Sequence, residues 1–141
     1  MGKWALAVGV VLSMAGCSHV RGVEVWNHPA AEAAYAEWLR TGMPGCGVLP
    51  PMYHVALEEL QRQCGNYEAS GCHIEGRIFV RMGLPNEDAV VVHEYLHYLL
   101  HCTGMDSDGE HTRRDVWCDV VGDCNRACVQ GRVLLNNGWC G

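Results

Sequence analysis

One stretch of this 141-residue chain combines a regular apolar pattern with reactive side chains: residues 87–102, EDAVVVHEYLHYLLHC. Its apolar residues recur at the spacing of one helix face, and they are Val90, Val92, Leu96 and Leu99. Glu87 and Asp88 place negative charge in the first turn, where it complements the helix macrodipole, and Gly104 follows the last turn. The pattern therefore predicts a helix over residues 87–102.

Within this helix, His93, Glu94 and His97 form a His-Glu-x-x-His motif. A helix turns by about 100° per residue, so the two histidines differ by about 40° and lie one turn apart. Two imidazoles in this arrangement can chelate one zinc ion, and Glu94 can reach a water molecule on that ion without binding the ion itself. The competing interpretation is a pair of surface histidines on an amphipathic helix, with an incidental glutamate between them.

A catalytic zinc site needs a third protein ligand and one open position. His101 lies about 12 Å along the helix axis from His93, because each residue rises by about 1.5 Å, so these two cannot share one ion. We expect the third ligand in the segment that returns after Gly104, residues 105–111. His111 is the first choice because a neutral imidazole suits zinc. The alternatives are Glu110, Asp106 and, less favoured, Asp108.

Local patterns predict the other elements of the fold. Periodic apolar residues predict helices over residues 30–40 and 52–64, and a short helix over residues 112–121. Alternating apolar residues predict one strand over residues 74–81, with Gly76 in a gap of the pattern. The chain thus predicts an α+β domain in which the motif helix packs on a small sheet, followed by an irregular C-terminal segment.

Nine cysteines in so short a chain indicate an oxidising compartment. If Cys17 is set aside, the other eight form an even number, as a disulfide framework requires. These eight are Cys46, Cys64, Cys72, Cys102, Cys118, Cys124, Cys128 and Cys140. Because no Cys-x-x-Cys pair is present, four disulfides are favoured over a thiolate zinc site.

The first 17 residues have the pattern of an export signal: Lys3, an apolar run and then small residues before Cys17. The ending Ala15-Gly16-Cys17 resembles the lipobox of bacterial lipoproteins. This resemblance implies a signal peptide at 1–16, a lipidated Cys17, a tether at 17–27 and a location in the cell envelope, on the outer membrane. The competing interpretation is an ordinary signal peptide cut nearby, with Cys17 left as a free thiol.

Charge and hydropathy exclude several kinds of partner. The net charge of −6 argues against binding to nucleic acid or to an anionic membrane surface. No apolar run reaches the roughly 18–20 residues of a membrane-spanning helix. We therefore expect no nucleic-acid partner, and membrane association through a lipid anchor alone.

The predicted strand at 74–81, the helix with its His-Glu-x-x-His motif and a downstream third ligand resemble the zincin superfamily of zinc metallopeptidases. The similarity covers residues 74–111. The chain departs from the metzincin pattern, because Leu100 and Thr103 stand where that family has a glycine and then a histidine. A gluzincin assignment needs Glu110 as a ligand, closer to the motif than is usual in that group. The resemblance is therefore to the superfamily and to no single family within it.

The resemblance implies a small zincin-like domain at 28–141 that hydrolyses a peptide or protein substrate in the cell envelope. Zinc is then held by His93, His97 and His111, while Glu94 acts as general base and then as general acid. In zincins the upper strand binds extended substrate, which points to residues 74–81 here. The alternative is a non-catalytic, disulfide-rich envelope lipoprotein that binds a partner or a structural metal, and a structural metal takes four protein ligands.

Overall fold

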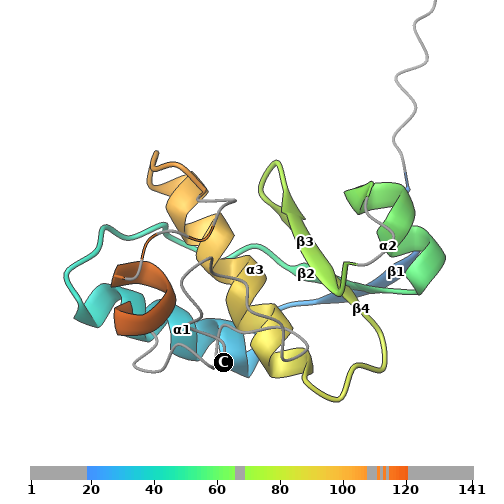
Figure 1. The fold of residues 1–141 in the computed structure, drawn as a ribbon, viewed down its shortest axis with the longest axis horizontal. Helices are drawn as coiled ribbons and strands as arrows, with labels where there is room; N and C mark the ends of the chain where they lie inside the picture. The colour runs from blue at the N-terminus through green and yellow to red at the C-terminus, as the bar shows by residue number, and fades with distance from the viewer. Residues whose placement is uncertain (1–18, 66–68, 108–110, 112, 114, 121–141) are drawn as a thin grey trace, which may run out of the picture.

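The computed structural model describes residues 19–65, 69–107, 111, 113 and 115–120 (Figure 1). Its elements in chain order are β1 (Gly22–Val25), α1 (Pro29–Arg40), β2 (Met52–Val55), α2 (Leu57–Cys64), β3 (Gly71–Ile74), β4 (Arg77–Arg81), α3 (Glu87–Cys102) and the π-helix η1 (Asp115–Val120). The chain is therefore a mixed α+β fold, as the sequence predicts. Two of the predicted helices, at 30–40 and 87–102, are confirmed as α1 and α3.

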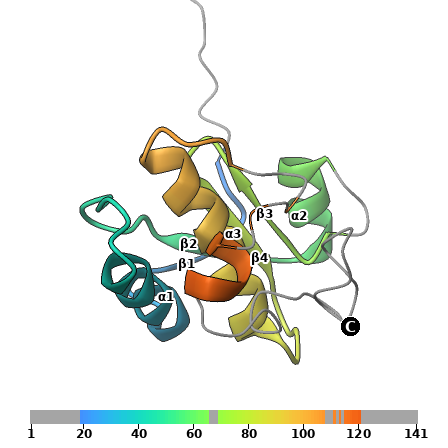
Figure 2. The same cartoon turned by 60° about the vertical axis from the view of Figure 1, so that its left-hand side comes forward.

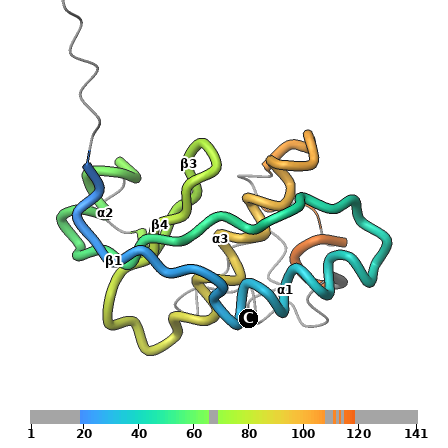
Figure 3. Tube along the Cα trace, turned by 180° about the vertical axis from the view of Figure 1, so that it is seen from behind, coloured from blue at the N-terminus to red at the C-terminus, as the bar shows by residue number. Residues whose placement is uncertain are grey.

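The four strands form one mixed sheet in the order β1-β2-β4-β3, so that β1 and β3 are its edges. β2 runs parallel to β4, whereas β1–β2 and β3–β4 are antiparallel pairs. Figure 3, seen from behind, shows β1 and β2 running side by side. Glu75 and Gly76 join β3 to β4 with φ values of 50° and 77°, and a tight two-residue hairpin turn needs positive φ at both positions.

Helices cover both faces of the sheet, and the strands alternate their side chains between them. Ile78 and Val80 of β4 pack against Val90 and Val91 of α3. Phe79, between them in sequence, packs on the opposite face with Leu60 of α2. Figures 1 and 2 show α3 lying across one face with α1 beside it, and α2 on the other side. The sheet thus presents its β3 edge alongside α3.

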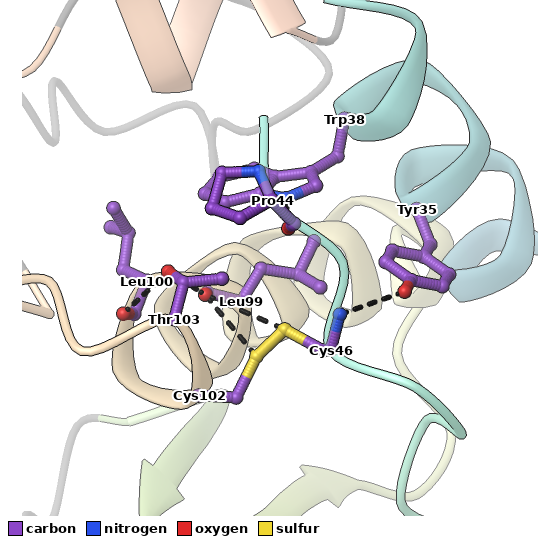
Figure 4. Close-up of a disulfide and its surroundings, with 8 residues drawn as sticks. All are labelled: Tyr35, Trp38, Pro44, Cys46, Leu99, Leu100, Cys102 and Thr103. Carbon is purple, nitrogen blue, oxygen red and sulfur yellow. Dashed lines mark hydrogen bonds between the residues drawn. A yellow bond between two sulfur atoms is a disulfide. The ribbon is translucent and has the colours of Figure 1, made fainter. Parts of the chain in front are cut away.

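A second part of the core lies where α1, α3 and η1 meet. Trp38 of α1 packs there with Leu96, Leu99 and Trp117, all of them fully buried. The Cys46–Cys102 disulfide joins the loop after α1 to the end of α3 (Figure 4). In the same loop, the indole N–H of Trp38 donates to the Pro44 carbonyl at 2.8 Å, and the Cys46 backbone N–H donates to the Tyr35 hydroxyl at 2.8 Å.

The predicted helix at 52–64 is wrong over its first turn, since residues 52–55 form β2 and only Leu57–Cys64 is helical. The cause lies in the burial of β2 on both faces. Met52 packs toward α3 and Val55 packs toward α2, yet their spacing of three residues imitates one stripe of a helix.

The predicted strand at 74–81 is wrong as a single strand, because Gly76 belongs to the turn of a hairpin and only residues 77–81 form β4. The predicted tether at 17–27 is also corrected in part: Gly22–Val25 pairs with β2 as strand β1. So short a strand has little pattern of its own, and its backbone hydrogen bonds come from β2. In the segment predicted as a short helix, 112–121, the described residues 115–120 are π-helical.

Two disulfides are described, Cys46–Cys102 and Cys64–Cys72, and Cys118 is disulfide-bonded as well. The predicted signal peptide 1–16 and the lipidation site Cys17 lie outside the described residues, as do three cysteines: Cys124, Cys128 and Cys140. Among the helices that the structure describes, none has the length and apolar character to cross a membrane.

Candidate metal centre

The three histidines predicted as ligands lie together. His93 and His97 project from successive turns of α3, and their Nε2 atoms are 3.3 Å apart. His111, from the segment that returns after α3, brings its own Nε2 to 3.0 Å from that of His93 and 3.1 Å from that of His97. His93 is buried, and the other two are half-buried. Three imidazole nitrogens thus converge on one point.

The spacing of these nitrogens fits a zinc ion. Tetrahedral zinc with Zn–N bonds of about 2.0–2.1 Å separates its ligand nitrogens by about 3.3–3.4 Å. The observed separations of 3.0–3.3 Å are close to that value. In the part of the chain that the structure describes, no fourth His, Cys, Asp or Glu joins the cluster. Three nitrogens at this spacing can form one face of a tetrahedron around a metal ion.

The backbone sets the tautomer of one ligand. The Nδ1 atom of His97 lies 2.6 Å from the carbonyl oxygen of Ser107. Because a carbonyl can only accept a hydrogen bond, Nδ1 carries the proton and Nε2 offers its lone pair to the cluster. Metal-binding histidines commonly use such a partner to fix the ring orientation. The Ser107 carbonyl therefore leaves His97 Nε2 free of its proton and able to bind a metal ion, a contact that sequence reasoning missed.

Trp117 of η1 supports the cluster from the core side. Its ring lies 4.9 Å from the ring of His93, 4.8 Å from His97 and 4.7 Å from His111, measured between centroids. The indole is 1% exposed, so it keeps water from that side of the imidazoles. π-helices occur often at functional sites, and here η1 places the indole. Sequence reasoning missed Trp117, since only the fold brings it beneath the motif.

Glu94 follows His93 on α3 and is 6% exposed. Burial raises the pKa of its carboxyl to about 8, and a hydrogen bond from the His73 backbone N–H lowers it in part. Carboxyls of raised pKa suit general acid–base work near neutral pH.

Gly71 lets the edge strand β3 approach α3 at Glu94. A Cβ atom at this position would lie 2.8 Å from Val90 Cγ1, 2.9 Å from the Phe79 carbonyl oxygen and 3.1 Å from Glu94 Cγ. Contacts under 3.0 Å do not occur without a shift of the backbone or the side chain, so only glycine fits. Sequence reasoning missed Gly71, because its spatial neighbours are distant in the chain.

A pocket of about 310 Å³ opens between β3 and α3. It is lined by Gly71, Cys72, His73, His93, Glu94, His97 and Ser107. The pKa of His73 is lowered to about 4, chiefly by burial and also by His101 and His97. The pocket therefore joins two of the three clustered histidines, the buried carboxyl and a neutral imidazole.

Other residues considered from sequence lie apart from the cluster. His101 lies outside the cluster, as its distance along the helix predicts; it is exposed near the end of α3, and its ring lies 5.3 Å from that of His73. Asp106 is described but does not join the cluster, whereas Asp108 and Glu110 lie outside the described residues. On β4, the Arg77 guanidinium lies 5.8 Å from the centre of the Phe79 ring.

The strand beside the pocket differs from the one expected to bind substrate. The predicted strand at 74–81 consists mainly of β4, which is paired on one side with β2 and on the other with β3. Its backbone groups are already used in these ladders. The edge strand next to the pocket is β3, residues 71–74.

Comparisons of this chain with protein families, with curated proteins and with solved structures find no match.

Proposed function

We propose that this protein is a zinc metallopeptidase that hydrolyses peptide bonds, with His93, His97 and His111 as zinc ligands. One observation carries the proposal: three imidazole nitrogens lie 3.0–3.3 Å apart, beside a buried glutamate that faces the same pocket. Ligands that leave one coordination position open are typical of catalytic rather than structural zinc. The resemblance of the motif to zincins supports the same reaction class.

Each group of the chain has a task in this reaction. A bound zinc ion supplies Lewis acidity, which polarises the substrate carbonyl and makes water a better nucleophile at neutral pH. Glu94 takes a proton from the attacking water and passes it to the leaving nitrogen. The Ser107 carbonyl and the Trp117 ring keep the histidine rings in place, so that little reorganisation is needed during the reaction.

The β3 edge supports a peptide as the substrate. An extended peptide can add to the edge of a sheet through main-chain hydrogen bonds, and here that edge lines the pocket. A chain bound there passes over Glu94, which Gly71 contacts from β3. The predicted setting, a lipid-anchored protein of the cell envelope, remains part of this proposal.

The alternative from sequence is a non-catalytic lipoprotein with a structural metal or a binding partner. A structural zinc site fills all four positions with protein ligands. Within the described residues the cluster supplies three, which favours the catalytic interpretation.

The test is zinc content together with cleavage of a quenched-fluorescence peptide library by the full, oxidised chain. We expect about one zinc per chain, cleavage that stops with 1,10-phenanthroline and returns with zinc, and a loss of zinc affinity of at least about 100-fold in His111→Ala. His101→Ala is the matched control, since it removes a histidine of the same region that lies outside the cluster. A zinc-loaded protein that cleaves no peptide would overturn the proposal, as would equal zinc affinity in the two variants.

A further inference from the structure

His73 lies on the edge strand β3 and faces the pocket from the side opposite α3. Cys72 is bonded to Cys64 at the end of α2, so the alternation of the strand turns Gly71 and His73 toward the other face of the sheet, where α3 lies. Gly71 meets Glu94 there. His73 lines the same pocket two residues further along the strand.

The hairpin turn determines which ring nitrogen of His73 carries the proton. The backbone N–H of Gly76 donates to Nε2 of His73 at 3.1 Å. A neutral imidazole has one N–H group, so the proton lies on Nδ1. The lone pair of His73 Nε2 is thus already used by Gly76, so His73 is not suited to bind a metal ion. Its free ring nitrogen offers one hydrogen-bond donor instead.

The other groups around the pocket already have tasks. Two of the lining histidines belong to the metal cluster, Glu94 is the proposed base and Cys72 is in a disulfide. Gly71 has no side chain. The side-chain donors that remain among the described lining residues are the imidazole of His73 and the hydroxyl of Ser107.

Of these two, the geometry favours His73. Its ring is held by the turn, by Tyr98 at 6.0 Å and by His101 at 5.3 Å between ring centroids, so its donor is set in place before a ligand arrives. Its backbone N–H also bonds the Glu94 carboxyl, which ties the position of the residue to that of the base. Donors held in advance stabilise developing charge best, because no reorganisation is needed.

We propose that His73 is a substrate-contacting residue whose Nδ1–H donates a hydrogen bond to the carbonyl oxygen of the peptide bond that is cleaved. This inference rests on the proposed function. As the water oxygen bonds to the carbonyl carbon, the C=O electron pair moves onto that oxygen and the hydrogen bond strengthens. When the C–N bond breaks, the pair returns, the leaving nitrogen takes its proton from Glu94, and His73 keeps its own proton throughout.

Two variants separate this role from support of the turn. His73→Asn retains an N–H donor near the Nδ1 position but loses the acceptor for Gly76. His73→Gln retains an acceptor near the Nε2 position but loses the donor at Nδ1. A residue that only supports the hairpin would tolerate Gln better than Asn, whereas a residue that contacts substrate would show the reverse order.

The experiment compares wild type, both variants and Ser107→Ala as full, zinc-loaded, oxidised chains with verified zinc content. We expect His73→Gln to lower kcat by about 10- to 100-fold with little change in KM, and His73→Asn to stay within about threefold of wild type. The second readout is the Kd of acetohydroxamate, a small zinc-binding carbonyl compound, measured by calorimetry. Its Kd should rise by about tenfold in His73→Gln, and by less in His73→Asn.

The outcomes decide between the possibilities. Equal kcat and Kd in all variants would overturn the role of His73, as would a larger loss in His73→Asn than in His73→Gln. A larger effect of Ser107→Ala would assign the donor to Ser107 instead. If acetohydroxamate binding depends on His73 while wild type cleaves no peptide, the donor role stands and the peptidase proposal fails.

Discussion

Two glutamates on opposite faces of the sheet are equally buried and yet opposite in character. Glu59 of α2 and Glu94 of α3 are each 6% exposed. The pKa of Glu59 is lowered to about 2, chiefly by its hydrogen bond with Arg62, whereas burial raises the pKa of Glu94 to about 8. Partners and the depth at which the carboxyl lies, and not the exposed fraction alone, therefore decide whether a carboxyl stays charged.

The partners explain what each carboxyl is suited to do. Glu59 accepts hydrogen bonds from the Arg62 guanidinium, from the Gln63 amide at 3.0 Å and from the Arg21 backbone N–H at 3.2 Å. It thereby joins α2 to the segment before β1, which is a structural role. Glu94 accepts a hydrogen bond from the His73 backbone N–H, and it faces the pocket. A carboxyl whose pKa lies near neutral can take up and release a proton near neutral pH.

The largest expected effect is the contrast between Glu94→Gln and Glu59→Gln. Loss of the base should lower kcat by about 10²- to 10⁴-fold while zinc content and the free energy of unfolding do not fall. Glu59→Gln should leave kcat unchanged and lower the free energy of unfolding by about 1 kcal/mol, a modest value because Arg62 is half exposed. Peptide cleavage and urea unfolding measure the two effects. A Glu94→Gln variant as active as wild type would contradict the role of Glu94 as general base.

A smaller effect is expected where β3 contacts Glu94. Gly71→Ala places a Cβ against Val90, the Phe79 carbonyl and Glu94, and we expect a loss of about 1–3 kcal/mol in stability with at least a tenfold loss in kcat/KM. Gly42→Ala is the matched control: its Cβ meets nothing within 4 Å, but its φ of 83° also costs stability, and Gly42 follows α1 away from the pocket. Comparable stability loss with unchanged kcat/KM in Gly42→Ala would show that the effect of Gly71 is on the site. Equal kcat/KM in the two variants would refute a specific effect of Gly71 on the site.

The smallest effect concerns the pH dependence of stability. The pKa of Glu59 is about 2 in the folded chain and near 4.5 when its partners are lost. Its charged partners therefore stabilise the fold fully above pH 4.5, and this contribution disappears as the pH falls from 4.5 toward 2. The difference in unfolding free energy between wild type and Glu59→Gln, followed by tryptophan fluorescence in urea, should shrink over that window. A difference that stays constant from pH 6 to pH 2.5 would argue against the ion pair.

The helix α3 and its histidine pair could be predicted because both depend only on the spacing of residues close together in the chain. The spacing of apolar residues along 87–102 identifies the buried stripe, and the rise of 1.5 Å per residue places His93 near His97 and far from His101. His111 was the first choice because a neutral imidazole suits zinc and the segment after Gly104 is long enough to fold back, although the path of residues 105–111 has no pattern of its own. The sheet was harder to predict, because Met52 and Val55 are buried on opposite faces and so imitate a helix stripe.

Sequence alone established the α+β class, the two helices α1 and α3, and the chemistry available to the His-Glu-x-x-His motif. Only the tertiary structure showed that His111 closes the cluster, that Trp117 lies beneath it, and that Gly71 brings β3 to Glu94. The physical reason is that the spacing of apolar residues reports only which nearby residues of one helix or strand face the core together. The distance between His93 and His111, or the partners that make Glu59 and Glu94 differ, arises only when segments distant in the chain pack together.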